Sequence, residues 1–497
     1  MGVAFLSYIL TIIFGMIAQV VFIDNLGTEY LGLNGLFTNV IAMLGIAELG
    51  IGNAIIYNLY KPIAKNDIEQ VKSLMIFYKN CYRVVAIIVF TIGILLIPFL
   101  SFFVGKVTVP VNITFIYLLF LIDIVCSYLL SYKRSILFAT QNNYIINLTH
   151  IGYTIITNIL QIIILIFTKN YYLYLGIKII TRLLENIAIS YIANTKYSYI
   201  LDKNYVKLDK KTKKDILKKI KALFFHKIGG FVVLGSDNII ISKFLGLVSV
   251  GLYSNYYMII NAIQSIFGQV MQATTASIGN MLVTENKDKY LQVFQKIRFL
   301  NFWISCFASI SILVIMQSFI VIWIGKEYLL STFVLMILVL NLFQKLMRYS
   351  FSNFKEAAGI FYEDRFVPLV EATLNIIASI ILCKWYGLAG VFIGTVISDL
   401  ALWCYSYPKY VYKKLFDRNY IEYAKETIGY IILFVLIASG TYYLSTIINF
   451  SNIYLEFISN VIISLIVPNA LLFIIFFKTD NFKYYSNLLK NLIKRTR

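Results

Sequence analysis

Residues 84–104 read VVAIIVFTIGILLIPFLSFFV, a stretch without a single charged side chain. About 20 mostly apolar residues are enough for an α-helix to cross the hydrocarbon core of a bilayer. The rest of the chain has the same character, because 60% of its 497 residues are hydrophobic and only 14% are charged. Soluble domains are roughly 45–50% apolar. The sequence therefore predicts an all-α polytopic membrane protein.

Apolar stretches of similar length recur along the chain, and we expect fourteen spanning helices. The first stretch lacks a basic leader and a small-residue cleavage site, so we expect a retained helix rather than a secretory signal. The expected spans cover residues 3–23, 35–60, 81–104, 112–133, 144–168, 171–194, 222–244, 248–278, 295–322, 328–350, 365–385, 387–407, 425–447 and 452–477.

Lys and Arg residues are distributed unevenly between the expected loops. With the N-terminus placed in the cytoplasm, the inner loops and the C-terminal tail hold 37 of the 44 basic residues, and the outer loops hold five. Basic residues concentrate in the cytoplasmic loops of membrane proteins, so both termini are predicted to be cytoplasmic. The net charge of +20 needs no nucleic-acid partner, because the basic residues are spread over many loops.

A short motif points to an internal repeat. Leu-Gly, four residues and Gly-Leu occur at residues 26–33 and again at 245–252, an offset of 219. Six helices per repeat is an even number, so two such repeats point the same way in the membrane. We expect a six-helix bundle over 1–196, a basic linker over 197–221 that is either amphipathic or solvated, a parallel six-helix bundle over 222–412, and two further helices with a basic tail over 413–497.

The residue types needed for catalysis and cofactor binding are sparse. The two His and five Cys residues are not clustered, which argues against a metal site or a disulfide framework. The sequence has no glycine-rich phosphate loop and no nucleophile motif. The expected outer loops hold only three acids, Asp24, Glu29 and Glu327. We therefore predict that the protein is not an enzyme and that it binds no cofactor or metal.

Charges inside the expected helices are the strongest functional signal, because a charge in a bilayer is costly and usually faces a cavity or a partner. Lys178, Arg182 and Glu185 lie at spacings of four and three, which places them on one helix face. They could form a self-neutralised structural patch. Alternatively, they could form the cationic wall of a central cavity that receives an anionic head group, and two cations against one acid favour an anion.

Four acids are also expected near mid-membrane: Glu48, Asp123, Asp237 and Asp399. Each could act as a gating partner, a counter-ion to Arg182 or a protonatable coupling group, or could serve only in interhelical hydrogen bonding. Glu371 lies near the inner end of its expected helix, where we expect it to pair with cytoplasmic cations.

Stretches spread over nearly the whole chain carry a family resemblance. They resemble the bacterial repeat-unit flippases for O-antigen and capsule, within the multidrug/oligosaccharidyl-lipid/polysaccharide exporter superfamily. The stretches are LGLNGLFTN (31–39), AELGIG (47–52), YNLYKPIA (57–64), HKIGG (226–230), DNIIISKFLG (237–246), GLYSNYY (251–257), SIGN (277–280), AAGIFYED (357–364) and GLAGVFIGTVIS (387–398).

This resemblance implies a V-shaped pair of six-helix bundles with two extra helices, working by alternating access in the bacterial cell membrane. The implied cargo is an undecaprenyl-diphosphate-linked oligosaccharide, whose diphosphate suits Lys178 and Arg182. Implied partners are a coupling H⁺ or Na⁺ and the polymerase and other proteins of polysaccharide assembly. Relatives carry an arginine near the position of Gln19, so a cavity cation on the first helix is replaced here by an amide.

Three other functions fit parts of the pattern. A drug or cation antiporter of the same fold would be expected to have an acid-dominated cavity. A membrane polymerase or ligase for the same sugars would need a large outer loop with Arg and His, and none is expected here. A scaffold subunit of the assembly machinery would have no use for charges at mid-membrane.

Overall fold

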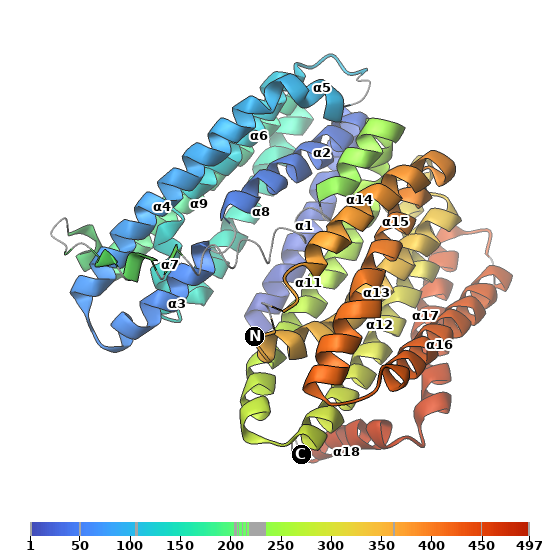
Figure 1. The fold of residues 1–497 in the computed structure, drawn as a ribbon. Coiled ribbons are helices and arrows are strands. Elements are labelled where there is room, and N and C mark those ends of the chain that lie inside the picture. The colour runs from blue at the N-terminus through green and yellow to red at the C-terminus, as the bar shows by residue number, and fades with distance from the viewer. Residues whose placement is uncertain are drawn as a thin grey trace. The chain divides into compact units, whose positions relative to one another are not determined.

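The structure is a computed structural model, and every regular element in its described part is a helix (Figure 1). The described residues are 2–48, 51–104, 108–202, 206, 208–210, 212–214, 216–217, 235–360, 363–448 and 450–495. Ten of the 25 residues of the expected linker over 197–221 lie outside them, as does the expected helix over 222–244 as far as residue 234.

The chain divides into two compact units, an N-terminal unit over residues 1–254 and a C-terminal unit over residues 255–497. Helix α11 (Leu247–Thr284) contributes to both units. The bundle boundaries expected from the repeat stay a prediction. We describe each unit by itself.

The N-terminal unit contains helices that match the expected spans in order but are more often interrupted. They are α1 (Gly2–Leu26), α2 (Thr28–Leu44), α3 (Ile51–Ala64), α4 (Ile68–Leu95), α5 (Leu100–Phe103), α6 (Ile113–Tyr128), α7 (Tyr132–Ala139), α8 (Asn143–Thr168) and α9 (Tyr171–Lys196). A 3₁₀ turn, η1 (Gly45–Glu48), follows α2 and interrupts the single helix expected over 35–60.

The chain bends by 44° between α6 and α7, so the helix expected over 112–133 corresponds to α6 and only the first residues of α7. Two serine side chains bond backbone carbonyls at this bend. The Ser127 hydroxyl donates to the carbonyl of Ile124 at 2.6 Å, and the Ser131 hydroxyl donates to the carbonyl of Ser127. Such bonds to the carbonyls of the preceding turn compete with the helical ladder and often bend a helix.

The C-terminal unit packs its helices around α12 and α13. After α11 come α12 (Lys287–Trp323), α13 (Thr332–Ala357), α14 (Val367–Tyr386), α15 (Leu388–Ala401), the π-helical stretch η5 (Leu402–Leu415), α16 (Tyr420–Ile447), α17 (Ile453–Phe476) and α18 (Asp480–Arg495). Helix α18 falls in the segment expected to be a basic tail. In the loop before α14, a hydrogen bond from Lys414 lowers the pKa of the Glu363 carboxyl below its ordinary value.

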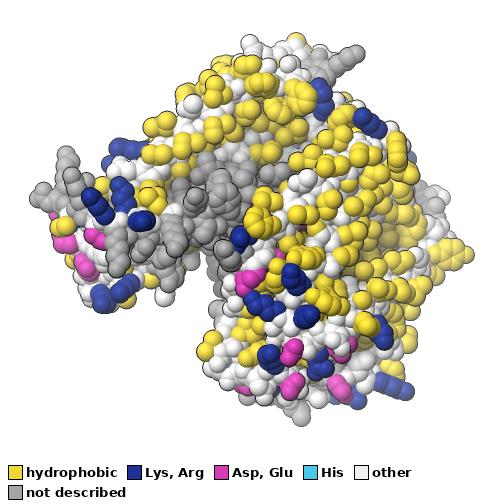
Figure 2. Space-filling model, in the orientation of Figure 1, with side chains coloured by type: hydrophobic (Ala, Val, Ile, Leu, Met, Phe, Trp, Pro, Cys, Tyr) yellow, Lys and Arg dark blue, Asp and Glu magenta, His cyan; other side chains and the backbone are white. Residues whose placement is uncertain are grey.

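Eight described helices are long and apolar enough to cross a membrane, or nine when α6 and α7 count as one bent span. Figure 2 shows hydrophobic side chains over the visible faces of α13 to α17, with charged side chains gathered near the end where α18 lies. The prediction of an all-helical, multi-pass membrane protein is confirmed. The count of fourteen spans and the two parallel six-helix bundles stay predictions.

Candidate functional site

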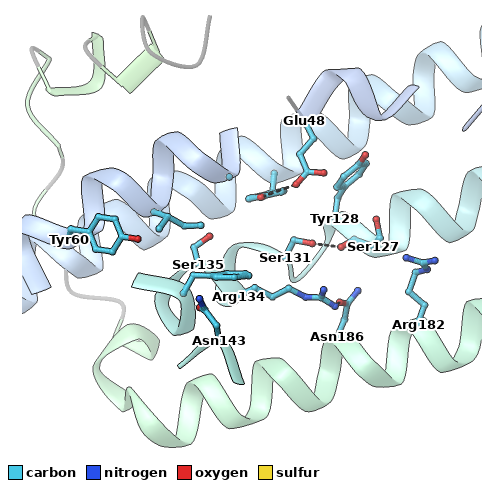
Figure 3. A pocket seen from close by; sticks show the side chains of 14 residues that line it. Glu48, Tyr60, Ser127, Tyr128, Ser131, Arg134, Ser135, Asn143, Arg182 and Asn186 are labelled. Carbon is cyan, nitrogen blue, oxygen red and sulfur yellow. Dashed lines mark hydrogen bonds between the residues drawn. The ribbon is translucent and has the colours of Figure 1, made fainter. Parts of the chain in front are cut away.

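A cavity of about 710 Å³ lies within the N-terminal unit (Figure 3). Glu48 and Tyr128 reach it from one side and Arg182 and Asn186 from the other. Its walls come from η1, α3, α4, α6, α7, α8 and α9. The lining residues are Glu48, Gly52, Ile56, Tyr60, Tyr82, Ser127, Tyr128, Ser131, Arg134, Ser135, Phe138, Asn143, Arg182 and Asn186.

Two arginines and one acid carry the charge of this cavity. Arg134 comes from α7 and Arg182 from α9, and their side chains are 29% and 39% exposed. Glu48 is the acid, and it accepts a hydrogen bond from the Tyr82 hydroxyl at 3.0 Å. The lining therefore has a formal charge of +1, which favours an anion over a cation.

Asp123 on α6 holds the two expected cations of α9 in place. Its carboxylate accepts from the Arg182 Nε at 2.5 Å and lies 3.6 Å from the Lys178 Nζ. The Lys178 ammonium also lies 4.8 Å from the centre of the Phe120 ring. Lys178 does not line the cavity, so of the two expected binding cations only Arg182 faces the space that a ligand would fill.

Glu185 binds residues outside its own helix. Its Oε1 accepts from the Arg134 Nη2 at 2.9 Å and lies 3.1 Å from the Nδ1 of His150. The Asn186 side chain also accepts from Arg134, at 2.8 Å. The α9 charges therefore pair with α6, α7 and α8 rather than forming a patch that neutralises itself along one helix.

Uncharged polar groups and aromatic rings make up much of the remaining lining. Serine hydroxyls and asparagine amides can donate and accept hydrogen bonds, as the hydroxyls of a sugar require. Tyrosine rings offer flat apolar faces with a polar edge. The residues are Ser127, Ser131, Ser135, Asn143 and Asn186, with Tyr60, Tyr82 and Tyr128.

The other expected site residues lie apart from this lining. Gln19 lies half-buried on α1, and Asp237 lies half-buried in the helical segment 235–245; neither lines the cavity. Asp399 lies in the C-terminal unit, where it accepts from the Arg348 Nη1 at 2.8 Å. The expected role of each residue stays a prediction.

Three arginines that the sequence places among inner-loop cations lie inside helices instead. Arg134 lines the cavity, Arg348 binds two acids on α14 and α15, and Arg298 is fully buried on α12 beside Glu426 at 2.5 Å. The reason is that several helices continue beyond the apolar segments that define the expected spans. Glu371, expected to pair with cytoplasmic cations, pairs with Arg348 inside the bundle at 3.0 Å.

A signal for Arg134 and Arg348 was present in the sequence. Arg134 bonds Glu185 and Arg348 bonds Asp399, and each pair is 51 residues apart. Arg134 and Glu185 are each 214 residues before their counterparts Arg348 and Asp399, close to the offset of 219 between the two Leu-Gly motifs. A similar interhelical ion pair therefore occurs in both units. Only the contacts reveal it, because many basic and acidic residues share that spacing by chance.

Comparison with solved structures identifies the fold. The lipid II flippase MurJ in an inward closed conformation matches with a TM-score of 0.69 and 14% identity, covering 98% of this chain and 100% of that one. An inward-facing multidrug resistance MATE family transporter of the MOP superfamily matches with a TM-score of 0.60 and 15% identity, covering 79% and 92%. A mutant of the Vibrio cholerae MATE transporter VcmN matches with a TM-score of 0.55 and 15% identity, covering 81% and 92%. At these identities the likeness shows a shared fold and no more.

Comparison of sequences with family models gives one match, described as polysaccharide biosynthesis protein, over residues 1–276. No curated protein sequence matches the chain. The family match covers more than half of the 497 residues, and it confirms the resemblance seen in the sequence motifs.

Proposed function

Because the chain belongs to the polysaccharide biosynthesis protein family, we propose that it flips an undecaprenyl-diphosphate-linked oligosaccharide repeat unit from the inner to the outer leaflet. The flipped repeat units would be assembled into capsule, exopolysaccharide or O-antigen. The protein would act as a transporter in the bacterial cell membrane, with cytoplasmic termini, rather than as an enzyme. A solved structure of the same fold is a lipid II flippase.

The cavity of the N-terminal unit is the observation that carries this proposal. Guanidinium groups bind phosphate oxygens in a planar, bidentate geometry. Arg182 bonds Asp123 through Nε, so its terminal nitrogens remain suited to a second anion. The serine, asparagine and tyrosine lining supplies hydrogen bonds and ring faces for the first sugars.

In this proposal the lipid tail stays in the bilayer while the head group crosses by alternating access. Asp123 and Glu185 orient the two arginines before the cargo arrives. Ligands bind more tightly to groups that are already held in their bound geometry, because less freedom is lost on binding. Release would follow when the bundles rearrange and the diphosphate meets water at the outer surface.

The leaflet position of lipid-linked oligosaccharide in cells depleted of the protein tests this function. Intact and lysed cells would be treated with a membrane-impermeant sugar label. We expect intermediates that the label reaches only after lysis. Intermediates already exposed in intact cells would contradict the proposal and favour a polymerase or scaffold.

A drug or cation antiporter remains the second candidate, because a MATE family transporter shares the fold and Glu48 faces the cavity. In that case depletion would leave the oligosaccharide intermediates unchanged in both leaflets and would raise the sensitivity of the cells to cationic compounds. The positive formal charge of the lining argues against this function.

A further inference from the structure

A cluster in the C-terminal unit holds two acids against one cation. The Nη1 atom of Arg348 donates to the Glu371 Oε1 at 3.0 Å and to the Asp399 Oδ1 at 2.8 Å. Because both oxygens contact the same nitrogen, the two carboxyl groups lie within about 6 Å of each other, where like charges interact strongly. The three residues come from α13, α14 and α15.

Burial makes this arrangement costly when both acids are ionised. The side chains of Glu371 and Asp399 are 7% and 1% exposed, while that of Arg348 is 24% exposed. A further titratable contact is the Tyr407 hydroxyl from η5, which accepts from the Arg348 Nε at 3.3 Å. With Tyr407 neutral, two carboxylates and one guanidinium leave a buried charge of −1, which the low-dielectric interior of a protein strongly disfavours.

The second oxygen of Asp399 supplies an independent observation. Asp399 Oδ2 is buried and has no hydrogen-bond partner among the described residues. A buried carboxylate oxygen without a donor is unfavourable. A proton on one of the two carboxyl groups would remove the excess charge and would supply a donor to the cluster.

The N-terminal unit contains a comparable arginine–acid pair, Arg134 and Glu185, that has no second acid beside it. Arg134 and Glu185 have the same 51-residue separation as Arg348 and Asp399. There, however, the third side chain is His150 rather than an acid. The charges of Arg134 and Glu185 already balance one to one, so of these two clusters only that of the C-terminal unit has a charge that a proton would neutralise.

We propose that Glu371 and Asp399 share one proton at neutral pH, held in place by Arg348. A metal cation is a poorer occupant, because it would lie close to the positive guanidinium that already contacts both acids. Loss of the proton leaves two negative charges competing for Arg348, which loosens the contacts between α13, α14 and α15. A role for this proton as the coupling ion of transport rests on the proposed function.

Infrared pH titration of the purified full-length protein tests the shared proton without any cargo. A protonated carboxyl group has a C=O stretching band separate from the bands of a carboxylate. An ordinary carboxyl group has a pKa of about 4, so we expect a protonated-carboxyl band that persists at neutral pH and disappears only under alkaline conditions. Comparison of the wild type with single variants assigns this band.

Glu371→Gln and Asp399→Asn each remove one acid while keeping the side-chain shape. Either variant should lose the neutral-pH band, because the remaining acid then pairs one to one with Arg348. Glu185→Gln in the N-terminal unit is the matched control and should keep the band. The proposal is overturned if wild type and both variants have equal bands, or if neither variant folds, since each mimics a protonated carboxyl group.

The coupling role has its own readout in reconstituted vesicles. An imposed pH gradient should change the rate of oligosaccharide flipping by the wild type, and Glu371→Gln should lose that response. If the infrared band behaves as expected but the protein flips no oligosaccharide, the proposed function is overturned. The shared proton between Glu371 and Asp399 is then still supported. Flipping that responds to pH equally in wild type and Glu371→Gln would overturn the coupling role.

Discussion

Asp123 is the residue that organises the cationic side of the cavity. Its carboxylate contacts both Lys178 and Arg182 and is itself only 10% exposed. Periodicity along the chain placed the two cations on one face of a helix. It did not reveal that a single acid from another helix serves both, because that depends on how α6 packs against α9.

The substitution Asp123→Asn should destabilise the protein. It removes the negative charge from two partly buried cations, and hydrogen bonds to charged groups contribute about 1.5–3 kcal/mol each. Thermal unfolding of the purified protein in detergent measures the effect. Glu69→Gln is a suitable control, because Glu69 is 57% exposed in its pair with Lys72 and surface pairs contribute roughly 0–1 kcal/mol. Equal unfolding midpoints for the two variants would contradict this account.

The two cavity arginines and Lys178 should differ in their effects on ligand binding. Arg134→Ala and Arg182→Ala should each weaken binding of a short-chain isoprenoid diphosphate about tenfold, since a charge-assisted bond is lost. Lys178→Ala should weaken binding less, because Lys178 lies behind the lining. Isothermal titration with the purified protein measures the three affinities.

The exposed Lys384, in the last turn of α14, gives a control that should leave the affinity unchanged when replaced by Ala. A larger loss for Lys178→Ala than for Arg182→Ala would show that the diphosphate binds deeper than the cavity lining indicates.

Among the elements, α14 and α15 approach each other closely at two glycines. A Cβ atom at Gly390 would lie 2.0 Å from the carbonyl oxygen of Leu382, and one at Gly394 would lie 2.5 Å from the backbone nitrogen of Ser379. The two glycines are four residues apart, and small residues at this spacing let neighbouring helices pack closely.

The substitution Gly390→Ala should therefore separate α14 from α15 and lower the yield of folded protein. Overpacking of this kind costs roughly 1–3 kcal/mol or more. Gly176→Ala in α9 supplies a control, because a Cβ atom at Gly176 would meet nothing within 4 Å. Detergent-solubilised yield and unfolding midpoint distinguish the two variants, and equal behaviour would refute the packing argument.

Helix ends were less predictable than helix cores. Helix α4 begins at Ile68, well before the expected start at residue 81, because the Asp67 side chain caps it by accepting from the amide of Gln70. Helix α18 ends the described chain, although its segment reads as a polar tail. The length of an apolar stretch identifies the part of a helix that lies in lipid. It does not show how far the helix continues beyond the lipid into water.

For the whole molecule, the distribution of basic residues predicts which ends of the helices face the cytoplasm. Single cysteines at Lys326 and Glu285, both exposed, would test this in a background where the five native cysteines are replaced. An impermeant thiol reagent should label Lys326→Cys in intact cells and Glu285→Cys only after lysis. The reverse pattern would place the termini outside.

Composition and periodicity alone were enough to predict a multi-pass helical membrane protein. The reason is that apolar length, charge bias and spacing are properties of the chain itself. The motifs were also enough to place it in its family. Tertiary structure decided which charges meet: Asp123 with Lys178 and Arg182, Glu185 with Arg134, and Glu371 and Asp399 with Arg348. These pairings join residues 23 to 59 positions apart, and only the packing of one helix against another selects among the many partners that such separations allow.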